Sequence, residues 1–218
     1  MEPWDWTPVL EQYRRYHAAH PQPPIPVLLG IELGGAQRDP KWAQEIIDGA
    51  PLDLVIGSVH TLSEQAGGED FFYLDYTDPT HCRDLMDDYM GSLVQLSRLP
   101  TYDILGHIIY PLRYIIGRGG HKMTVEPWMD RMDEVLKNAI HSGRGIEVNT
   151  HYGKDLDVWR PVLARYRRLG GEIITVSSDA HRGAHVGGGV KQAAQLLREA
   201  GFGYLTRYRQ RKAEQVKL

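Results

Sequence analysis

The chain has 218 residues, of which 42% are hydrophobic and 24% are charged, and its formal net charge is -3. This composition is typical of one ordinary soluble domain, expected over residues 1–218, and the lack of a basic surplus argues against a nucleic-acid partner. No apolar run approaches the roughly 20 residues of a membrane span, and Cys82 is the only cysteine, so we expect a cytoplasmic protein without disulfides or membrane contact.

The chain opens with a predicted helix, because apolar residues recur at helical spacing from Val9 to Tyr16 and Pro21 then ends the pattern. Short apolar runs predict strands at residues 25–33, 52–60, 102–108, 145–150 and 172–178. Apolar stripes predict helices around residues 42–47, 85–96, 128–140, 156–168 and 190–200. Gly201 is the expected cap of the last helix, residues 202–205 a possible last strand, and residues 207–218 a solvated tail.

The regular alternation of strands and helices predicts a parallel sheet, and the continuous apolar strands indicate that helices cover both of its faces. An α/β barrel, or part of one, is therefore the expected fold. The polar and aromatic stretch at residues 60–80 is expected to be a loop over the strand ends, where substrate pockets often form.

Five acidic or histidine residues stand where predicted strands end: Glu32, His60, His107, Asp179 and His181. Because the carboxyl ends of parallel strands meet at one rim, we expect these side chains to surround a common cavity. Carboxylates and imidazoles are the ligands from which zinc, iron and manganese sites are made. The pattern therefore predicts a hydrolytic metal centre.

Five short segments also carry a family resemblance. They are Gly-Ile-Glu at 30–32, Ile-Gly-Ser-Val-His at 56–60, Asp-Ile-Leu-Gly-His at 103–107, Glu-Val-Asn-Thr at 147–150 and Ser-Asp-Ala-His at 178–181. In order and approximate spacing they resemble histidinol-phosphate phosphatases of the PHP (polymerase and histidinol phosphatase) superfamily.

The resemblance implies a distorted, TIM-like (β/α)7 barrel that uses up to three divalent metal ions, zinc, manganese or iron. The implied reaction is hydrolysis of the small phosphate ester histidinol phosphate to histidinol and phosphate, a step of histidine biosynthesis. By resemblance, Glu32 bridges two metals, and His60 and His107 complete the shell of the middle ion. Asp179 then belongs to one outer metal and His181 to the other.

Other residues are weaker candidates for the site. Arg113, expected on a tyrosine-rich loop, is a candidate for gripping the phosphate with its planar fork, and a surface salt bridge is the alternative. Asn149, at a strand end, is a candidate for a substrate hydrogen bond, whereas Glu147 is interpreted as structural. The glycines at 187–189 are interpreted as a turn. Surface or loop positions are expected for five histidines: His81, His121, His141, His151 and His185.

The chain departs from the family pattern at its start. The family's His-x-His strand and Asp-His strand are not found before Glu32, so about one β-α-β unit, on the order of 30 residues, is expected to be missing. The pair His17 and His20 is interpreted as a solvated helix end rather than a substitute. Glu32, His60 and His107 still form a His2Glu set, which can hold one zinc.

Two functional hypotheses therefore remain. The first is an active metal-dependent phosphatase, and the second is a catalytically impaired or non-catalytic PHP-fold protein that keeps at most one metal and a binding role. An incomplete barrel would expose strand edges, so we also expect either self-association into a homo-oligomer or a chain that is a fragment of a longer protein.

Overall fold

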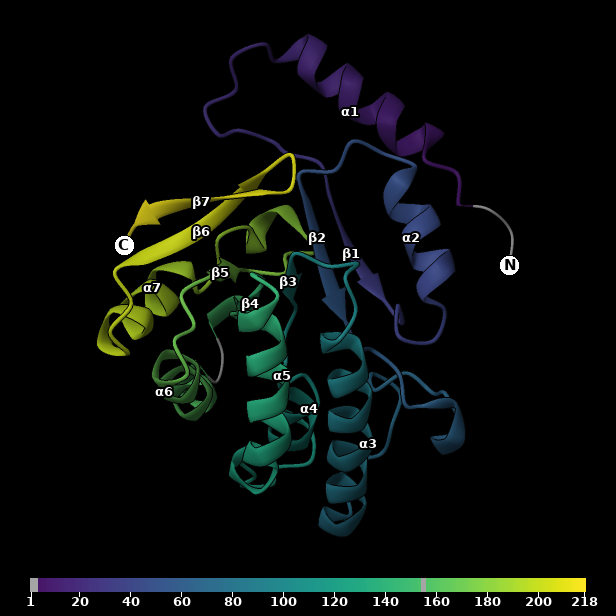
Figure 1. Ribbon diagram of the computed structural model, residues 1–218, viewed down its shortest axis with the longest axis vertical. Helices are drawn as coiled ribbons and strands as arrows, with labels where there is room; N and C mark the ends of the chain where they lie inside the picture. The colour runs from purple at the N-terminus through teal and green to yellow at the C-terminus, as the bar shows by residue number, and fades with distance from the viewer. Residues whose placement is uncertain (1–3, 154–155) are drawn as a thin grey trace.

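Five parallel strands form the centre of the fold (Figure 1). The computed structural model describes residues 4–153 and 156–218. In these residues the strands pair in chain order: β1 (Gly30–Gly34), β2 (Leu54–Ser58), β3 (Ile104–Leu105), β4 (Gly145–Asn149) and β5 (Ile174–Ser177). Because all of them point the same way, their carboxyl ends share one rim. The predicted α/β fold with a parallel sheet is confirmed.

Helices precede, connect and follow the strands of the parallel sheet, and one contiguous hydrophobic core fills the space between the layers. They are α1 (Thr7–Ala19), α2 (Pro40–Asp48), α3 (Pro79–Ser97), α4 (Leu112–Gly117), α5 (Met129–His141), α6 (Arg160–Arg168) and α7 (Val190–Glu199). Two of them start at capping aspartates: Asp39 accepts from the Trp42 amide and Asp78 from the Thr80 amide. No helix in the described ranges is long and apolar enough to cross a bilayer.

The segment before β1 is not a strand, so the prediction of a strand over residues 25–33 is wrong in its first half. Pro26 has no amide hydrogen to donate to a neighbouring strand, which confines regular pairing to the residues beyond it. Helix α1 lies near the amino ends of the strands, and the arrowheads of β1 and β2 point away from it (Figure 1). It buries none of its own residues, although the preceding Trp6 is buried and donates to the Ile46 carbonyl at 2.8 Å.

The C-terminal tail forms an antiparallel hairpin of β6 (Tyr204–Arg209) and β7 (Lys212–Lys217). Most residues from 207 to 218 are exposed, which agrees with the predicted solvated tail, although the tail is a regular hairpin. Its two turn residues, Gln210 and Arg211, have φ angles of 51° and 60°, a conformation that costs energy in residues other than glycine. Asp53 holds the turn, because its carboxylate accepts from the Gln210 amide and its carbonyl from the Arg211 amide, each at 2.9 Å.

The Arg211 side chain fastens this hairpin to the amino end of β3. Its guanidinium donates to the Asp103 carboxylate, with distances of 3.1 Å from Nε and 2.9 Å from Nη2 to Oδ1. Arg211→Ala leaves the largely buried Asp103 carboxylate without its charged partner, so we expect the free energy of unfolding to fall by about 2–3 kcal/mol. Urea denaturation measures the change.

A matched control for this variant lies on the same hairpin. Arg207 pairs with Glu214 at the surface, at 2.8 Å, and Arg207→Ala should change the unfolding free energy by less than about 1 kcal/mol. Equal losses in the two variants would show that the Asp103 contact does not anchor the hairpin.

Candidate metal centre

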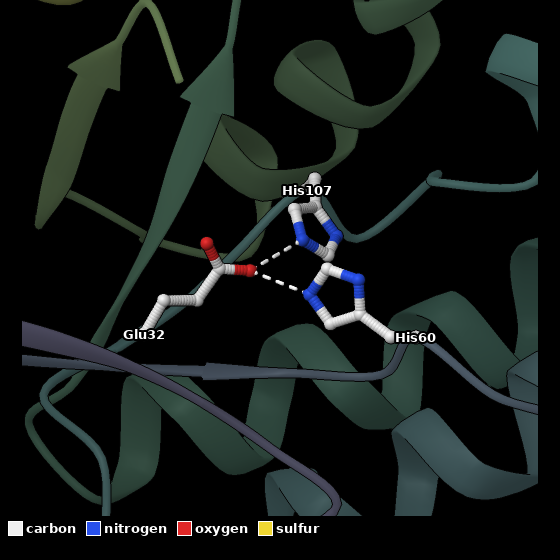
Figure 2. A group of neighbouring side chains, drawn as sticks. All are labelled: Glu32, His60 and His107. Atoms are coloured by element: carbon white, nitrogen blue, oxygen red, sulfur yellow. Dashed lines mark hydrogen bonds and ion pairs between the residues drawn. The ribbon is translucent and has the colours of Figure 1, made fainter. Parts of the chain in front are cut away.

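Glu32, His60 and His107 meet at the carboxyl rim of the sheet (Figure 2). Glu32 lies on β1, His60 follows β2 by two residues and His107 follows β3 by two. The Nε2 atoms of His60 and His107 lie 2.7 and 2.8 Å from the same oxygen, Glu32 Oε1. One ligand atom from each residue can be chosen so that all three lie within 4.8 Å of one another. The sequence-based expectation that these side chains converge is confirmed.

The charge on Glu32 is set by these contacts. Burial opposes ionisation, but the hydrogen bonds from His107 and His60 outweigh it and hold the pKa of Glu32 well below its usual value. An ionised carboxylate only accepts hydrogen bonds, so both imidazole Nε2 atoms donate to it. A cation that takes the same atoms as ligands would displace those protons, which makes its affinity dependent on pH.

The three side chains fit a divalent cation. A carboxylate with two imidazoles is the His2Glu set of catalytic zinc, which leaves a coordination position open. His107 is almost fully buried, and its Nδ1 has no hydrogen-bond partner among the residues that the structure describes. Such unsatisfied buried atoms are rare and mark places where water or an ion completes a site.

Asp179, His181 and Arg113 stand beside this group. Arg113 lies in α4 and not on a loop, so that part of the prediction is wrong. Its Nη1 is 3.6 Å from Asp179 Oδ2, and its Nη2 donates to Asn149 Oδ1 at 3.0 Å. His181 is exposed, and its Nδ1 donates to the Asp179 carbonyl at 2.9 Å. Asn149 therefore lies near the rim and helps to position the Arg113 guanidinium.

A cavity of about 590 Å³ joins these residues. Its lining includes Glu32, His60, Arg113, Asp179 and His181, and its other walls come from Asp70, Phe72, Tyr73, Tyr110, Tyr114, Gly117, Arg118 and His151. His107 and Asn149 line a smaller crevice that shares Tyr110, Arg113 and His151 with the cavity. All seven residues singled out from the sequence thus lie in or beside one space.

Three residues that follow strands at this rim have strained backbones. His107, His151 and Asp179 have φ angles of 29°, 41° and 51°, which non-glycine residues rarely adopt. Strain of this kind persists only where the surroundings impose it, and it is concentrated at functional sites. His151, expected at the surface or on a loop, lines both the cavity and the crevice. The sequence does hold a signal for it, because His151 directly follows the predicted strand at 145–150, the placement that singled out the other residues of this rim.

Glu147 lies beneath the group on β4 and is fully enclosed. Its Oε2 accepts from the His107 amide at 3.0 Å, and burial raises the pKa of its carboxyl group. The preceding Gly106 packs closely on β2, because a Cβ there would lie 2.7 Å from Ile56 Cγ2. Glu147 therefore supports the backbone that presents His107, in agreement with its structural interpretation.

Two other sequence features lie outside the metal group. The glycines at 187–189 form a turn, as predicted, and Gly189 begins α7 with a φ of 75°. His17 and His20 are on or next to α1, where His17 Nε2 donates to the Val27 carbonyl at 3.1 Å. These two histidines therefore supply no ligand to the group at the rim.

The sequence model of the PHP domain family matches residues 5–151 of the chain. The chain is 29% identical over 174 residues to a probable histidinol-phosphatase of Clostridium acetobutylicum, which covers 78% of this chain and 66% of that protein. It is 26% identical over 186 residues to the histidinol-phosphatase of Lactococcus lactis, covering 82% and 66%. The chain thus spans slightly less than two thirds of the length of these curated relatives.

Among solved structures, the fold is similar to the crystal structure of histidinol phosphate phosphatase from Lactococcus lactis complexed with zinc, L-histidinol and phosphate. The TM-score is 0.78 at 22% sequence identity, and the match covers 96% of this chain and 80% of that chain. At this level of identity the likeness establishes a shared fold.

Proposed function

We propose, from the premise that this chain belongs to the PHP domain family, that it is a metal-dependent phosphatase acting on histidinol phosphate or a similar small phosphate monoester. The observation that carries the proposal is the convergence of Glu32, His60 and His107 on one point at the rim of the sheet. The names of the relatives, histidinol-phosphatases, support the choice of ester.

Glu32, His60 and His107 are proposed to hold the cation. A divalent cation there supplies an acidified water as nucleophile and offsets negative charge on the phosphoryl oxygens. Arg113 grips the phosphate with its planar fork, while Asp179 and Asn149 hold the guanidinium in place. The zinc of the similar Lactococcus structure supports zinc as the ion, with manganese and iron as the other choices. Asp179 and His181 are proposed as ligands of further ions, up to three in all.

The cavity suits a small phosphorylated substrate. Its volume of about 590 Å³ lies within the range of roughly 300–1,000 Å³ usual for small-molecule sites. The Lactococcus protein was crystallised with L-histidinol and phosphate, the two products of the proposed reaction. Acidic side chains and two arginines, Arg113 and Arg118, in the lining give the space both signs of charge.

A second function, a non-catalytic PHP-fold protein, is favoured by one observation. Within the described residues, the close ligand group contains three side chains, enough for one cation. The resemblance implies up to three. A protein that keeps one ion and binds a phosphorylated ligand without turnover would fit the same geometry.

Metal analysis combined with a phosphate-release assay separates the two functions. For the phosphatase we expect at least one equivalent of zinc, manganese or iron, and release of phosphate from histidinol phosphate that stops on chelation and returns when the metal is restored. One bound equivalent without turnover under any of these metals would support the non-catalytic protein.

Self-association remains a separate proposal. Strand β1 is an edge of the described sheet, and its unpaired backbone groups suit pairing with a second copy. The molar mass in solution tests it, and a monomer at all concentrations would contradict it. We also propose a cytoplasmic location, because Cys82 has no partner cysteine and is buried.

A further inference from the structure

Two of three consecutive aromatic residues, Phe72 and Tyr73, line the cavity, and the third, Phe71, is buried behind them. Phe71 is fully buried, with its ring centroid 5.6 Å from that of Tyr89, and its amide donates to the His60 carbonyl at 2.9 Å. Phe72 and Tyr73 are 50% and 74% exposed, and both line the cavity. Phe71 therefore anchors the segment beside the metal group, and the next two rings face the space in front of it.

Asp70 fixes the turn that presents the two rings. Its Oδ1 accepts from the Phe72 amide at 2.7 Å, and its carbonyl accepts from the Tyr73 amide at 2.9 Å. Asp70 lines the cavity as well. The wall consequently combines a carboxylate with two aromatic faces.

Arg118 holds the wall from the other side. Its guanidinium carbon lies 4.4 Å from the centroid of the Phe72 ring and 4.5 Å from that of Tyr114, and Nη1 donates to the Phe72 carbonyl. These contacts tie the loop at residues 60–80 to the end of α4. Because both ends of the turn are held, the rings are in place before a ligand binds. The entropic cost of ordering them on binding is therefore small.

The chemistry of this wall selects a particular kind of ligand. Arg118 already lies over the Phe72 ring, so the highly exposed ring of Tyr73 gains most from a ligand that stacks on it, and tyrosine faces attract cations. The Asp70 carboxylate adds attraction for positive charge. Arg113, which also lines the cavity, attracts the opposite charge of a phosphate. The Asp70 carboxylate and the Tyr73 ring therefore favour a flat cation, while Arg113 favours an anion.

We propose that Asp70, Phe72 and Tyr73 form a specificity wall that recognises the leaving group of the phosphate ester as a flat ring carrying positive charge. This inference rests on the proposed phosphatase function and adds the residues that choose among esters. An imidazole with a nearby ammonium group, as in histidinol, has the required chemistry.

Two variants separate the ring from the charge. Tyr73→Ala removes a highly exposed ring and should lower kcat/KM roughly 10-fold for esters with a ring, histidinol phosphate and phenyl phosphate. It should spare phosphoethanolamine, which has charge but no ring. Asp70→Asn keeps the oxygen that holds the turn. It should lower kcat/KM roughly 10-fold for the two esters with a cationic leaving group, histidinol phosphate and phosphoethanolamine, and spare phenyl phosphate.

A matched control is Tyr204→Ala. Tyr204 on β6 is 50% exposed, like Phe72, but does not line the cavity, so all three kcat/KM values should stay unchanged. Equal losses on all esters in Tyr73→Ala and Asp70→Asn, or no loss on any, would overturn the specificity wall.

A binding measurement keeps this test distinct from that of the proposed function. Calorimetry with L-histidinol alone should show affinity about 10-fold weaker in Tyr73→Ala than in the parent protein. If no ester is hydrolysed but this difference is found, the phosphatase proposal fails and the wall stands. If esters are hydrolysed and histidinol affinity is unchanged in the variant, the wall fails and the phosphatase stands.

Discussion

Replacing Glu32 by glutamine is expected to empty the metal site and to slow ester hydrolysis on the order of 1,000-fold. Glu32 Oε1 is the atom on which His60 and His107 converge, and its negative charge is what offsets a cation between them. The amide keeps an oxygen that can accept a hydrogen bond, so the fold should survive. It loses the charge, and the two imidazoles alone hold a divalent ion weakly. Elemental analysis of the purified variant and its rate of phosphate release measure the two effects.

Two controls sharpen this result. Glu134→Gln removes a surface carboxylate that pairs with Arg98, and it should leave metal content and rate unchanged. His17→Asn removes the histidine of α1 that pairs with the Val27 carbonyl, with the same expectation. A Glu32→Gln protein that retains both its metal and its rate would show that the ion binds elsewhere.

The strands of the sheet were predictable because their apolar runs are short, continuous and bounded by polar residues. The residues at which the strands begin and end were less predictable. β3 was expected over residues 102–108, but regular pairing is limited to Ile104–Leu105. The chain leaves the sheet at Gly106 and His107, where a positive φ turns the imidazole toward Glu32. The backbone turn that brings His107 to the rim shortens β3, and the local sequence pattern does not predict this shortening.

The elements that escaped prediction depend on distant partners. The turn between β6 and β7 has Gln210 and Arg211 where hairpins of this type favour asparagine and glycine, so it carries no turn signal. Its conformation is maintained by Asp53, 157 residues before Gln210, and by Asp103, 108 residues before Arg211. Contacts over such separations are invisible to a reading of local pattern.

The candidate site also has one part that was predictable from the sequence and one part that was not. Glu32, His60, His107, Asp179 and His181 could be placed on one rim because each follows or ends a predicted parallel strand. Another wall of the cavity comes from the loop at residues 60–80, and its arrangement depends on how Asp70 and Arg118 bind the turn between them. Residues on regular elements were thus placed by topology, whereas residues on loops needed coordinates.

The cavity is lined by Arg113 and Arg118, and Arg113 is the one held beside Asn149 and Asp179. Its guanidinium carbon lies 5.1 Å from the Tyr110 ring centroid, one nitrogen bonds Asn149, and another faces Asp179. The ring and the two acceptors fix the plane of the fork. A fixed guanidinium can offer paired hydrogen bonds to phosphate oxygens at little entropic cost, whereas a lysine presents a single mobile charge.

Arg113→Ala is therefore expected to lower kcat/KM for phosphate monoesters roughly 100- to 1,000-fold, and Arg113→Lys roughly 10-fold or more, because the charge returns without the fork. Steady-state kinetics measure both, and Arg98→Ala, which removes an exposed arginine paired with Glu134, should have no effect. Inhibition by inorganic phosphate supplies a second readout, since an anion-binding arginine affects its inhibition constant directly. If kcat/KM falls in Arg113→Ala while phosphate inhibits as strongly as before, Arg113 acts by positioning Asp179 and does not bind the phosphate.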